Sequence, residues 1–338
     1  MQNVQRQLFN IGSPHRILRC SFDILQFAFA IKCCQVTVAI AITAGVFTVA
    51  PSVARAAPPY EITPDVIYGH KAGMALTFDV IRPEEPNGAG VMFMMSSAWV
   101  SKWMPPESLV DAEAPARGRF LGRLVDHGYT LFIVRHGSSP QFKVPEAVAD
   151  VRRAARYVQR NAEAFGIDPA RIGVCGASAG GHLSLMLGTT ADDGDGKAED
   201  PIARTSDRVA AVVAFYPPVD LREWVGDERF AALHFDPKLA ESVSPLLYVT
   251  PDDAPTLLVH GDQDGLVNVD NSERIFAALQ EDNVPCDFVV IEGAGHAFPG
   301  EMGERASEAL IEWFDKHLAA AGDGSTNTAD PEPAAASR

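Results

Sequence analysis

The strongest constraint on the fold is a repeated alternation of short apolar runs with longer helix-like segments. Strand-like runs occur at 90–95, 129–134, 171–175, 209–215, 256–260 and 287–291, and helical patterns lie at 114–128, 144–165, 178–187, 269–281 and 301–320. Continuous apolar runs are typical of strands buried on both faces of a parallel sheet. Two earlier runs, 66–68 and 75–81, are joined by a turn at Gly73 and read as a hairpin. The pattern predicts an α/β fold with a mostly parallel central sheet of about eight strands, an antiparallel N-terminal hairpin and helices on both faces.

The two ends of the chain differ from this central part. Residues 1–35 hold four basic side chains and one acidic one, residues 36–50 are apolar, and Ala54-x-Ala56 fits a signal-peptidase site. The apolar stretch is short for a membrane-spanning helix, which needs about 20 residues. We therefore expect 1–56 to be a signal peptide cleaved near Ala56, giving a secreted or periplasmic protein, with an uncleaved N-terminal membrane anchor as the alternative. Residues 321–338 lack core-forming side chains and predict a disordered tail.

The charge and the cysteines exclude several classes of partner. The formal net charge is −16, and an acidic surface repels the phosphates of nucleic acids and anionic lipids. No cysteine or histidine spacing resembles a zinc site. We expect no nucleic-acid partner, no stable membrane association after signal cleavage, and no metal.

One pentapeptide has the pattern of a catalytic turn. Gly176-Ala177-Ser178-Ala179-Gly180 lies between the strand-like run 171–175 and a helix-like segment. In that setting G-x-S-x-G forces the serine onto a strained turn that projects its hydroxyl from the sheet. A dinucleotide-binding loop is the competing interpretation, but the G-x-G-x-x-G pattern is absent. The sequence therefore predicts Ser178 as a nucleophile.

A serine nucleophile needs a histidine base that a carboxylate orients. His296 follows the last apolar strand, which places it at the carboxyl edge of the sheet together with Ser178. The run 257–260 ends in a turn that carries Asp262 and Asp264, and both are candidates for the acid, with Asp220 as a third. We favour Asp264 and expect Asp262 to stabilise the turn.

The order Ser, Asp, His, together with G-A-S-A-G-G-H, H-G-D-x-D-x-x-V and G-A-G-H-A-F, resembles the α/β-hydrolase superfamily. Within it the chain is similar to the secreted esterase/lipase and prolyl-oligopeptidase-like branch, over about residues 60–318. The resemblance implies an α/β-hydrolase domain over 57–320, the catalytic acid at Asp264, and a carboxylic ester hydrolase without a cofactor.

One segment departs from that branch, whose members often carry H-G-G-G-W after the third strand. Here the stretch is Met95-Ser96-Ser97-Ala98-Trp99. Because the oxyanion hole uses backbone amides, we expect one donor from Ala179 and the other from Ser97 or Ala98. Trp99 is a candidate substrate-binding residue, with packing of the loop as the alternative. Trp224 and Phe230 predict a small lid over 217–254.

These features predict a serine hydrolase that cleaves carboxylic esters of small substrates, with short acyl chains or acetylated sugars, through an acyl-enzyme intermediate. A small-substrate serine aminopeptidase of the prolyl-oligopeptidase type is one alternative. A hydrolase-fold binding module with weak or no catalysis is another, and the presence of all three triad residues argues against it.

Overall fold

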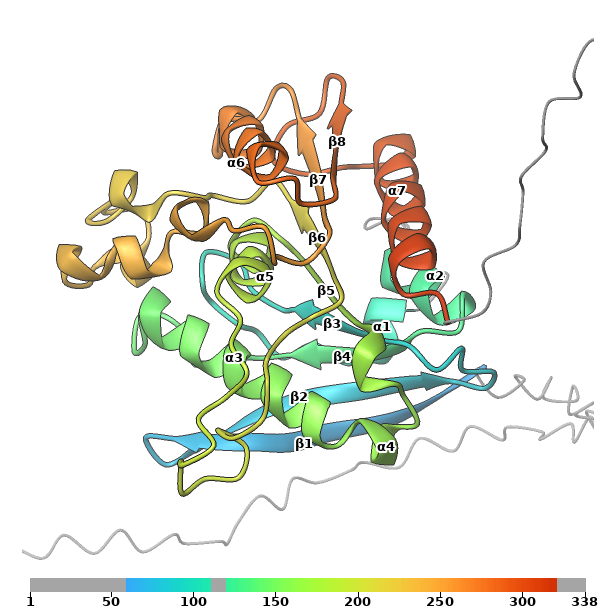
Figure 1. The fold of residues 1–338 in the computed structure, drawn as a ribbon. Coiled ribbons are helices and arrows are strands. Elements are labelled where there is room, and N and C mark those ends of the chain that lie inside the picture. Colours follow the sequence, from blue (N-terminus) through green and yellow to red (C-terminus); the bar gives the residue numbers. More distant parts are fainter. Residues whose placement is uncertain (1–58, 111–119, 321–338) are drawn as a thin grey trace, which may run out of the picture. The chain divides into compact units, whose positions relative to one another are not determined.

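The computed structural model describes residues 59–110 and 120–320 (Figure 1). The predicted signal peptide and the predicted disordered tail lie outside the described residues. Within the described ranges no helix has the length and apolar character that crossing a membrane requires.

The centre of the fold is an eight-stranded sheet with strand order β1-β2-β4-β3-β5-β6-β7-β8. The long strands β1 (Tyr60–Lys71) and β2 (Met74–Pro83) form an antiparallel hairpin, and β2 continues antiparallel to β4 (Thr130–Val134). All other pairings are parallel, and they join β3 (Gly90–Met94), β4, β5 (Ile172–Ala177), β6 (Ala211–Phe215), β7 (Thr256–Gly261) and β8 (Cys286–Ile291). The predicted sheet and its antiparallel hairpin are confirmed.

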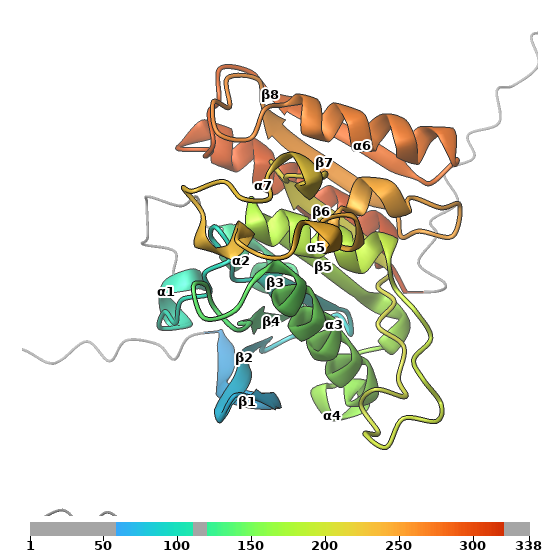
Figure 2. The ribbon, with the colours of Figure 1, turned by 90° about the vertical axis from the view of Figure 1, so that its left-hand side faces the viewer.

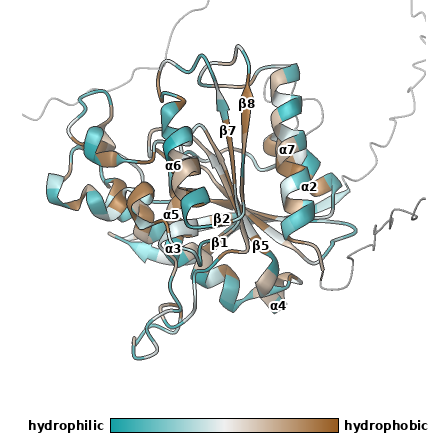
Figure 3. Cartoon of the chain, turned by 45° about the horizontal axis from the view of Figure 1, so that its top comes forward, coloured by the Kyte–Doolittle hydropathy of each residue, from teal (hydrophilic) through white to brown (hydrophobic). Residues whose placement is uncertain are grey.

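Helices cover both faces of this sheet (Figure 3). On one face lie α3 (Val144–Arg160), α5 (Ala179–Thr189) and α6 (Asp270–Glu281), and on the other lie α2 (Phe120–Asp126) and α7 (Glu301–His317). Side chains of a strand alternate between the faces, so Val212 and Ala214 of β6 enter one core while Val213 and Phe215 enter the other. Burial on both sides explains why these strands read as unbroken apolar runs.

Two helical segments differ from the sequence pattern. The predicted helix 144–165 is interrupted at Asn161, so α3 is followed by the short α4 (Ala162–Phe165), which ends at Gly166 with a φ of 68°. The short helix α1 (Glu107–Val110) follows β3 and was not predicted. Of the predicted helix 114–128, the described part forms α2, and residues 111–119 lie outside the described residues.

The predicted lid segment, 217–254, contains five 3₁₀ turns. They are η3 (Leu221–Glu223), η4 (Ala231–Leu233), η5 (Pro237–Leu239), η6 (Glu241–Val243) and η7 (Pro245–Tyr248). The segment lies beside α3 and α5 (Figure 2), where Lys143 Nζ donates to Ala231 O over 2.7 Å. Inside it the Trp224 and Phe230 rings pack with centroids 6.3 Å apart.

The parallel strands end at one common edge of the sheet, and the segments that follow them meet there. These segments include residues 95–103 after β3, 135–142 after β4, Ser178 after β5 and the turn 262–268 after β7.

Candidate active site

Ser178 lies on a sharp turn between β5 and α5. Its backbone has φ 55° and ψ −119°, a conformation that residues other than glycine rarely adopt. Its amide donates to Phe215 O over 2.8 Å. The flanking glycines permit this turn. A Cβ on Gly176 would lie 2.5 Å from the Gly180 backbone, and one on Gly180 would lie 2.5 Å from Met94 O. The start of α5 therefore presses directly against the end of β3.

His296 connects Ser178 to Asp264. Its Nε2 lies 2.9 Å from Ser178 Oγ, and its Nδ1 lies 2.7 Å from Asp264 Oδ2. A carboxylate accepts only, so Nδ1 carries the proton and Nε2 accepts the hydrogen bond from the Ser178 hydroxyl. The structure thus brings together all three residues that the sequence predicts.

The three candidate aspartates have different partners. Asp264 is buried, and its Oδ1 accepts hydrogen bonds from the amides of Leu266 at 2.9 Å and Val267 at 3.0 Å. Asp262 accepts from the Gly293 amide at 2.7 Å on the exposed side of the turn. Asp220 is paired with two arginines, Arg222 at 2.7 Å and Arg274 at 3.1 Å. Of these three carboxylates, Asp264 is the one hydrogen-bonded to His296.

Two neighbours of this series are not among the residues that the sequence analysis names. The Tyr216 ring packs on His296 with centroids 4.6 Å apart, and burial followed by the Asp264 charge raises the pKa of its phenol to about 12. Its only signal in the sequence is an aromatic residue at the end of a strand.

His260, the second neighbour, is buried. Its Nε2 donates to Val267 O at 2.9 Å and its Nδ1 accepts from Ser272 Oγ at 2.7 Å. His260 therefore has a structural role beneath Asp264.

The predicted oxyanion segment forms a tight turn. Ser97 and Val100 exchange two backbone hydrogen bonds, 3.0 and 2.9 Å long, and Ala98 and Trp99 between them have φ values of 52° and 55°. Positive φ at both central residues is the type I′ geometry. The Ser97 amide is engaged in the turn, whereas those of Ala98 and Ser96 donate to no other group in the described part of the chain. Ala179 is the first residue of α5, where an amide has no partner within the helix.

Trp99 lies in the core. Its side chain is 3% exposed, and its Nε1 donates to Nδ1 of the fully buried His182 at 3.2 Å. A side chain with so little exposed surface has almost none to offer a substrate, so the geometry favours packing over the predicted substrate-binding role. Trp103, which is 61% exposed, is the tryptophan of this loop that reaches the surface.

A second serine–histidine pair supports the same loop. His136 is buried, its Nδ1 donates to Gly137 O at 2.9 Å, and its Nε2 accepts from Ser96 Oγ at 2.8 Å. Because Ser96 uses its hydroxyl hydrogen on His136, that hydrogen is not offered to an oxyanion. The Ser139 amide also donates to Trp99 O at 3.1 Å. The segments after β3 and β4 are therefore fastened together, which the sequence analysis did not foresee.

The described residues include no group of three or more histidine, cysteine or acidic side chains arranged to hold a metal ion.

Several known proteins are similar to this chain in sequence or in fold. Among curated proteins, the chain is 29% identical over 191 residues to the esterase LipC of Mycobacterium tuberculosis, a match covering 53% of this chain and 47% of LipC. The chain spans about half the length of LipC and of two further curated relatives from the same organism, the esterase LipQ and the probable carboxylic ester hydrolase LipM.

Among solved structures, a carbohydrate esterase from gut microbiota has a TM-score of 0.61 at 24% identity, covering 76% of this chain and 97% of that one. An acetyl ester-xyloside bifunctional hydrolase from Caldicellulosiruptor lactoaceticus has a TM-score of 0.63 at 23% identity, covering 75% of this chain and 95% of that one. These likenesses establish a shared fold. The family description BD-FAE matches residues 101–279, which is more than half of the chain. The chain belongs to the BD-FAE family and has the α/β-hydrolase fold.

Proposed function

We propose that this protein is a carboxylesterase-type serine hydrolase that cleaves esters of small substrates through an acyl-enzyme intermediate. The observation that carries the proposal is the continuous hydrogen-bonded series from Asp264 through His296 to Ser178. The named esterases among the curated relatives support an ester substrate.

In the proposed reaction, His296 Nε2 takes the proton from Ser178 Oγ as that oxygen attacks the ester carbonyl. The imidazolium then protonates the leaving alcohol, and water repeats the two steps on the acyl-enzyme. Asp264 keeps Nδ1 protonated and stabilises the positive charge that develops on the ring. Tyr216 packs on the imidazole and keeps its phenol proton, so it restricts the ring without adding a charge.

The oxyanion of the tetrahedral intermediate would be held by backbone amides. Ala179 N–H is one proposed donor, since it begins α5 beside the nucleophile. Ala98 is the other, because the Ser97 amide is engaged by Val100 and Ala98 keeps its amide unused. The contact of Gly180 with Met94 O supports this pairing, since it brings the start of α5 against the strand that leads into the turn.

Two further segments belong to the same proposal. Residues 217–254 would act as a small lid over the site. Residues 1–56, which lie outside the described residues, would act as a signal peptide that directs the protein to the periplasm or the outside of the cell. A peptide substrate is the competing chemistry, because an acyl-enzyme also forms from an amide.

The first test replaces the nucleophile. Ser178→Ala removes the attacking oxygen, so turnover of p-nitrophenyl acetate and labelling by a fluorophosphonate probe should both be lost. Ser206→Ala alters a half-buried serine whose hydroxyl donates to Asp192 O and accepts from the Arg208 amide, and both signals should remain. Labelling or turnover that survives in Ser178→Ala would overturn the proposal. Faster cleavage of aminoacyl-naphthylamides than of short acyl esters by the unmodified protein would favour the peptidase.

A further inference from the structure

The two proposed oxyanion donors belong to separate segments of the chain. Ala98 lies in the turn at 97–100 after β3, and Ala179 is the first residue of α5. Both amides must point at one oxygen, and a site of this kind tolerates displacements of only about 0.5 Å. The contacts that fix the turn against α5 therefore decide whether the two amides can act together.

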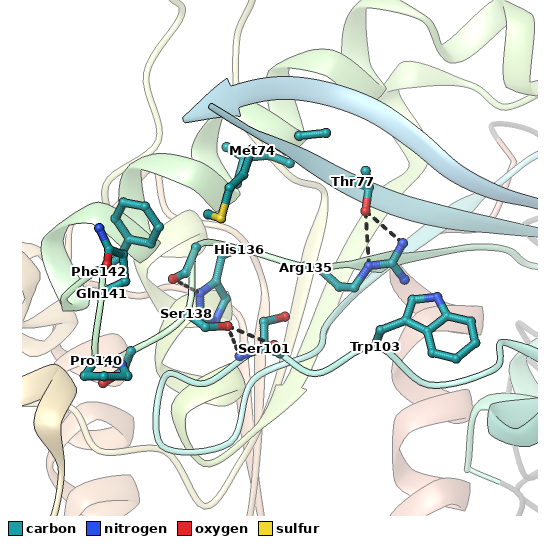
Figure 4. A pocket seen from close by; sticks show the side chains of 14 residues that line it. Met74, Thr77, Ser101, Trp103, Arg135, His136, Ser138, Pro140, Gln141 and Phe142 are labelled. Atoms are coloured by element: carbon teal, nitrogen blue, oxygen red, sulfur yellow. Dashed lines mark hydrogen bonds between the residues drawn. The ribbon is translucent and has the colours of Figure 1, made fainter. Parts of the chain in front are cut away.

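Packing alone does not fix residues 95–103, the segment that carries the turn. On one side this segment borders a hollow of about 410 Å³, which Ser101, Trp103 and residues 135–142 help to line (Figure 4). Hydrogen bonds hold the segment at that end, where the Ser138 hydroxyl accepts from the Ser101 amide at 2.9 Å and donates to Ser101 O at 2.8 Å. These bonds tie the segment to residues that follow β4, and they do not reach α5.

One side-chain hydrogen bond links the turn to α5. Trp99, which directly follows Ala98, donates from its indole Nε1 to Nδ1 of His182 at 3.2 Å, and the two rings meet edge to face with centroids 5.5 Å apart. Within the described ranges this is the only hydrogen bond between residues 97–100 and α5. The His182 amide donates to Ser178 O at 2.9 Å, so the imidazole belongs to the first helical turn after the nucleophile. The pair of rings therefore connects the Ala98 amide to the start of α5.

The other end of the imidazole is held by the segment 217–254. His182 Nε2 donates to Val243 O at 2.8 Å, and Val243 and the neighbouring Ser244 are both buried. An indole N–H only donates and a carbonyl only accepts, so both bonds form together only in the neutral ring with its proton on Nε2. Val243 O thereby leaves Nδ1 able to accept from Trp99.

We propose that His182 is a positioning residue for the reaction. Through Trp99 it holds the Ala98 amide in line with the amide of Ala179. Val243 O keeps the ring in the tautomer that can do so. The role needs no contact with the substrate, since His182 is fully buried. The inference rests on the proposed esterase function, because the placement of two oxyanion donors matters only to a protein that forms the tetrahedral intermediate.

Two amide side chains separate the two bonds of the imidazole. In His182→Asn the side-chain oxygen takes the place of Nδ1 and still accepts from Trp99, while the donor to Val243 O is lost. In His182→Gln the side-chain nitrogen takes the place of Nε2 and still donates to Val243 O, while the acceptor for Trp99 is lost. We expect kcat for p-nitrophenyl acetate to fall at least about tenfold in His182→Gln, because loss of one oxyanion donor costs about 10²–10³. In His182→Asn it should stay within about threefold, and KM should change little in either variant.

Trp99→Phe gives the same test without changing the buried histidine. It keeps an aromatic ring in the core but removes the indole N–H, so kcat should fall as in His182→Gln, again with little change in KM. The double variant should be no slower than the slower single variant, because both changes remove one bond. The matched control is Tyr129→Phe, which removes the 2.7 Å hydrogen bond from a buried phenol to Asp315 at the amino end of β4 and should leave kcat as it is.

The comparison is made at a temperature at which circular dichroism shows each variant to be folded. Unchanged kcat in Trp99→Phe, equal losses in His182→Gln and His182→Asn, or fully additive losses in the double variant would each overturn the positioning role while the esterase function stands. If the unmodified protein turns over no ester, the proposed function fails and this inference fails with it.

Discussion

At the scale of single residues, the turn after β7 assigns two nearby carboxylates to different tasks. Asp264 is buried, bonded to two backbone amides and to His296, and therefore fixed in position. Asp262 lies on the exposed side and accepts a hydrogen bond from the Gly293 amide. Spacing in the sequence left both open, because a turn this short can aim either side chain toward the sheet edge. Burial and hydrogen-bond partners decide between them.

Replacing each aspartate by asparagine tests this division. Asp264→Asn keeps the shape but lets an amide face Nδ1, so His296 takes the tautomer that cannot accept the Ser178 proton. We expect kcat for p-nitrophenyl acetate to fall by about 10⁴, as in related triads. Asp262→Asn weakens one loop hydrogen bond, and kcat should fall less than about threefold, since surface changes of this kind perturb little. Equal losses in the two variants would remove Asp264 from the proposed mechanism.

At the scale of elements, the chain uses the same tight-turn geometry twice. Ala98 and Trp99 have positive φ in the turn from Ser97 to Val100, which we call the oxyanion turn for its proposed role. Ala72 and Gly73 have positive φ, at 47° and 79°, in the turn between β1 and β2. An alanine with this backbone is strained by about 1 kcal/mol or more. In the hairpin the strain serves only the reversal of the chain. In the oxyanion turn it fixes the amide that we propose as a donor.

Glycine substitutions at the two alanines separate stability from activity. Ala98→Gly and Ala72→Gly both relieve strain, but both also give the unfolded chain more freedom, so each should change the free energy of unfolding by less than about 1 kcal/mol. Only Ala98→Gly loosens the proposed donor, and we expect a several-fold lower kcat with that variant alone. Urea unfolding and ester kinetics measure the two effects. A full kcat in Ala98→Gly would place the second oxyanion donor elsewhere.

The elements also explain how far the sequence could predict the molecule. Strands buried on both faces and the glycines around Ser178 leave strong local patterns, so the sheet and the position of the serine turn followed from the sequence. The oxyanion turn has no such local pattern in the sequence, because Ala98 and Trp99 are residues that ordinarily avoid positive φ. The break at Asn161 and the burial of Trp99 against His182 depend on packing partners far along the chain.

At the scale of the whole molecule, one imidazole joins three distant parts of the chain. His182 lies fully buried in α5, accepts from Trp99 of the oxyanion turn at 3.2 Å, and donates to Val243 O of the 217–254 segment at 2.8 Å. Both bonds require the neutral ring with its proton on Nε2. Burial lowers the pKa of His182 to about 4, against a backbone hydrogen bond that acts in the opposite direction.

This coupling makes stability depend on pH in a definite direction. Between pH 6.5 and about 4, His182 is protonated in the unfolded chain but stays neutral in the folded protein. The stabilisation that neutral His182 gives is therefore complete above pH 6.5 and is lost as the pH falls. We expect the difference in unfolding free energy between pH 7.5 and pH 5 to be about 2 kcal/mol larger in the unmodified protein than in His182→Asn.

Burial also lowers the pKa values of His136 and His260, but both residues remain in the variant, so their contributions cancel in the comparison. Should His182→Asn fold too weakly for urea titration, His182→Gln offers the same comparison with the donor to Val243 retained. Parallel pH profiles in unmodified and variant protein would mean that His182 carries its charge in the folded state and does not hold these three segments together as a neutral ring.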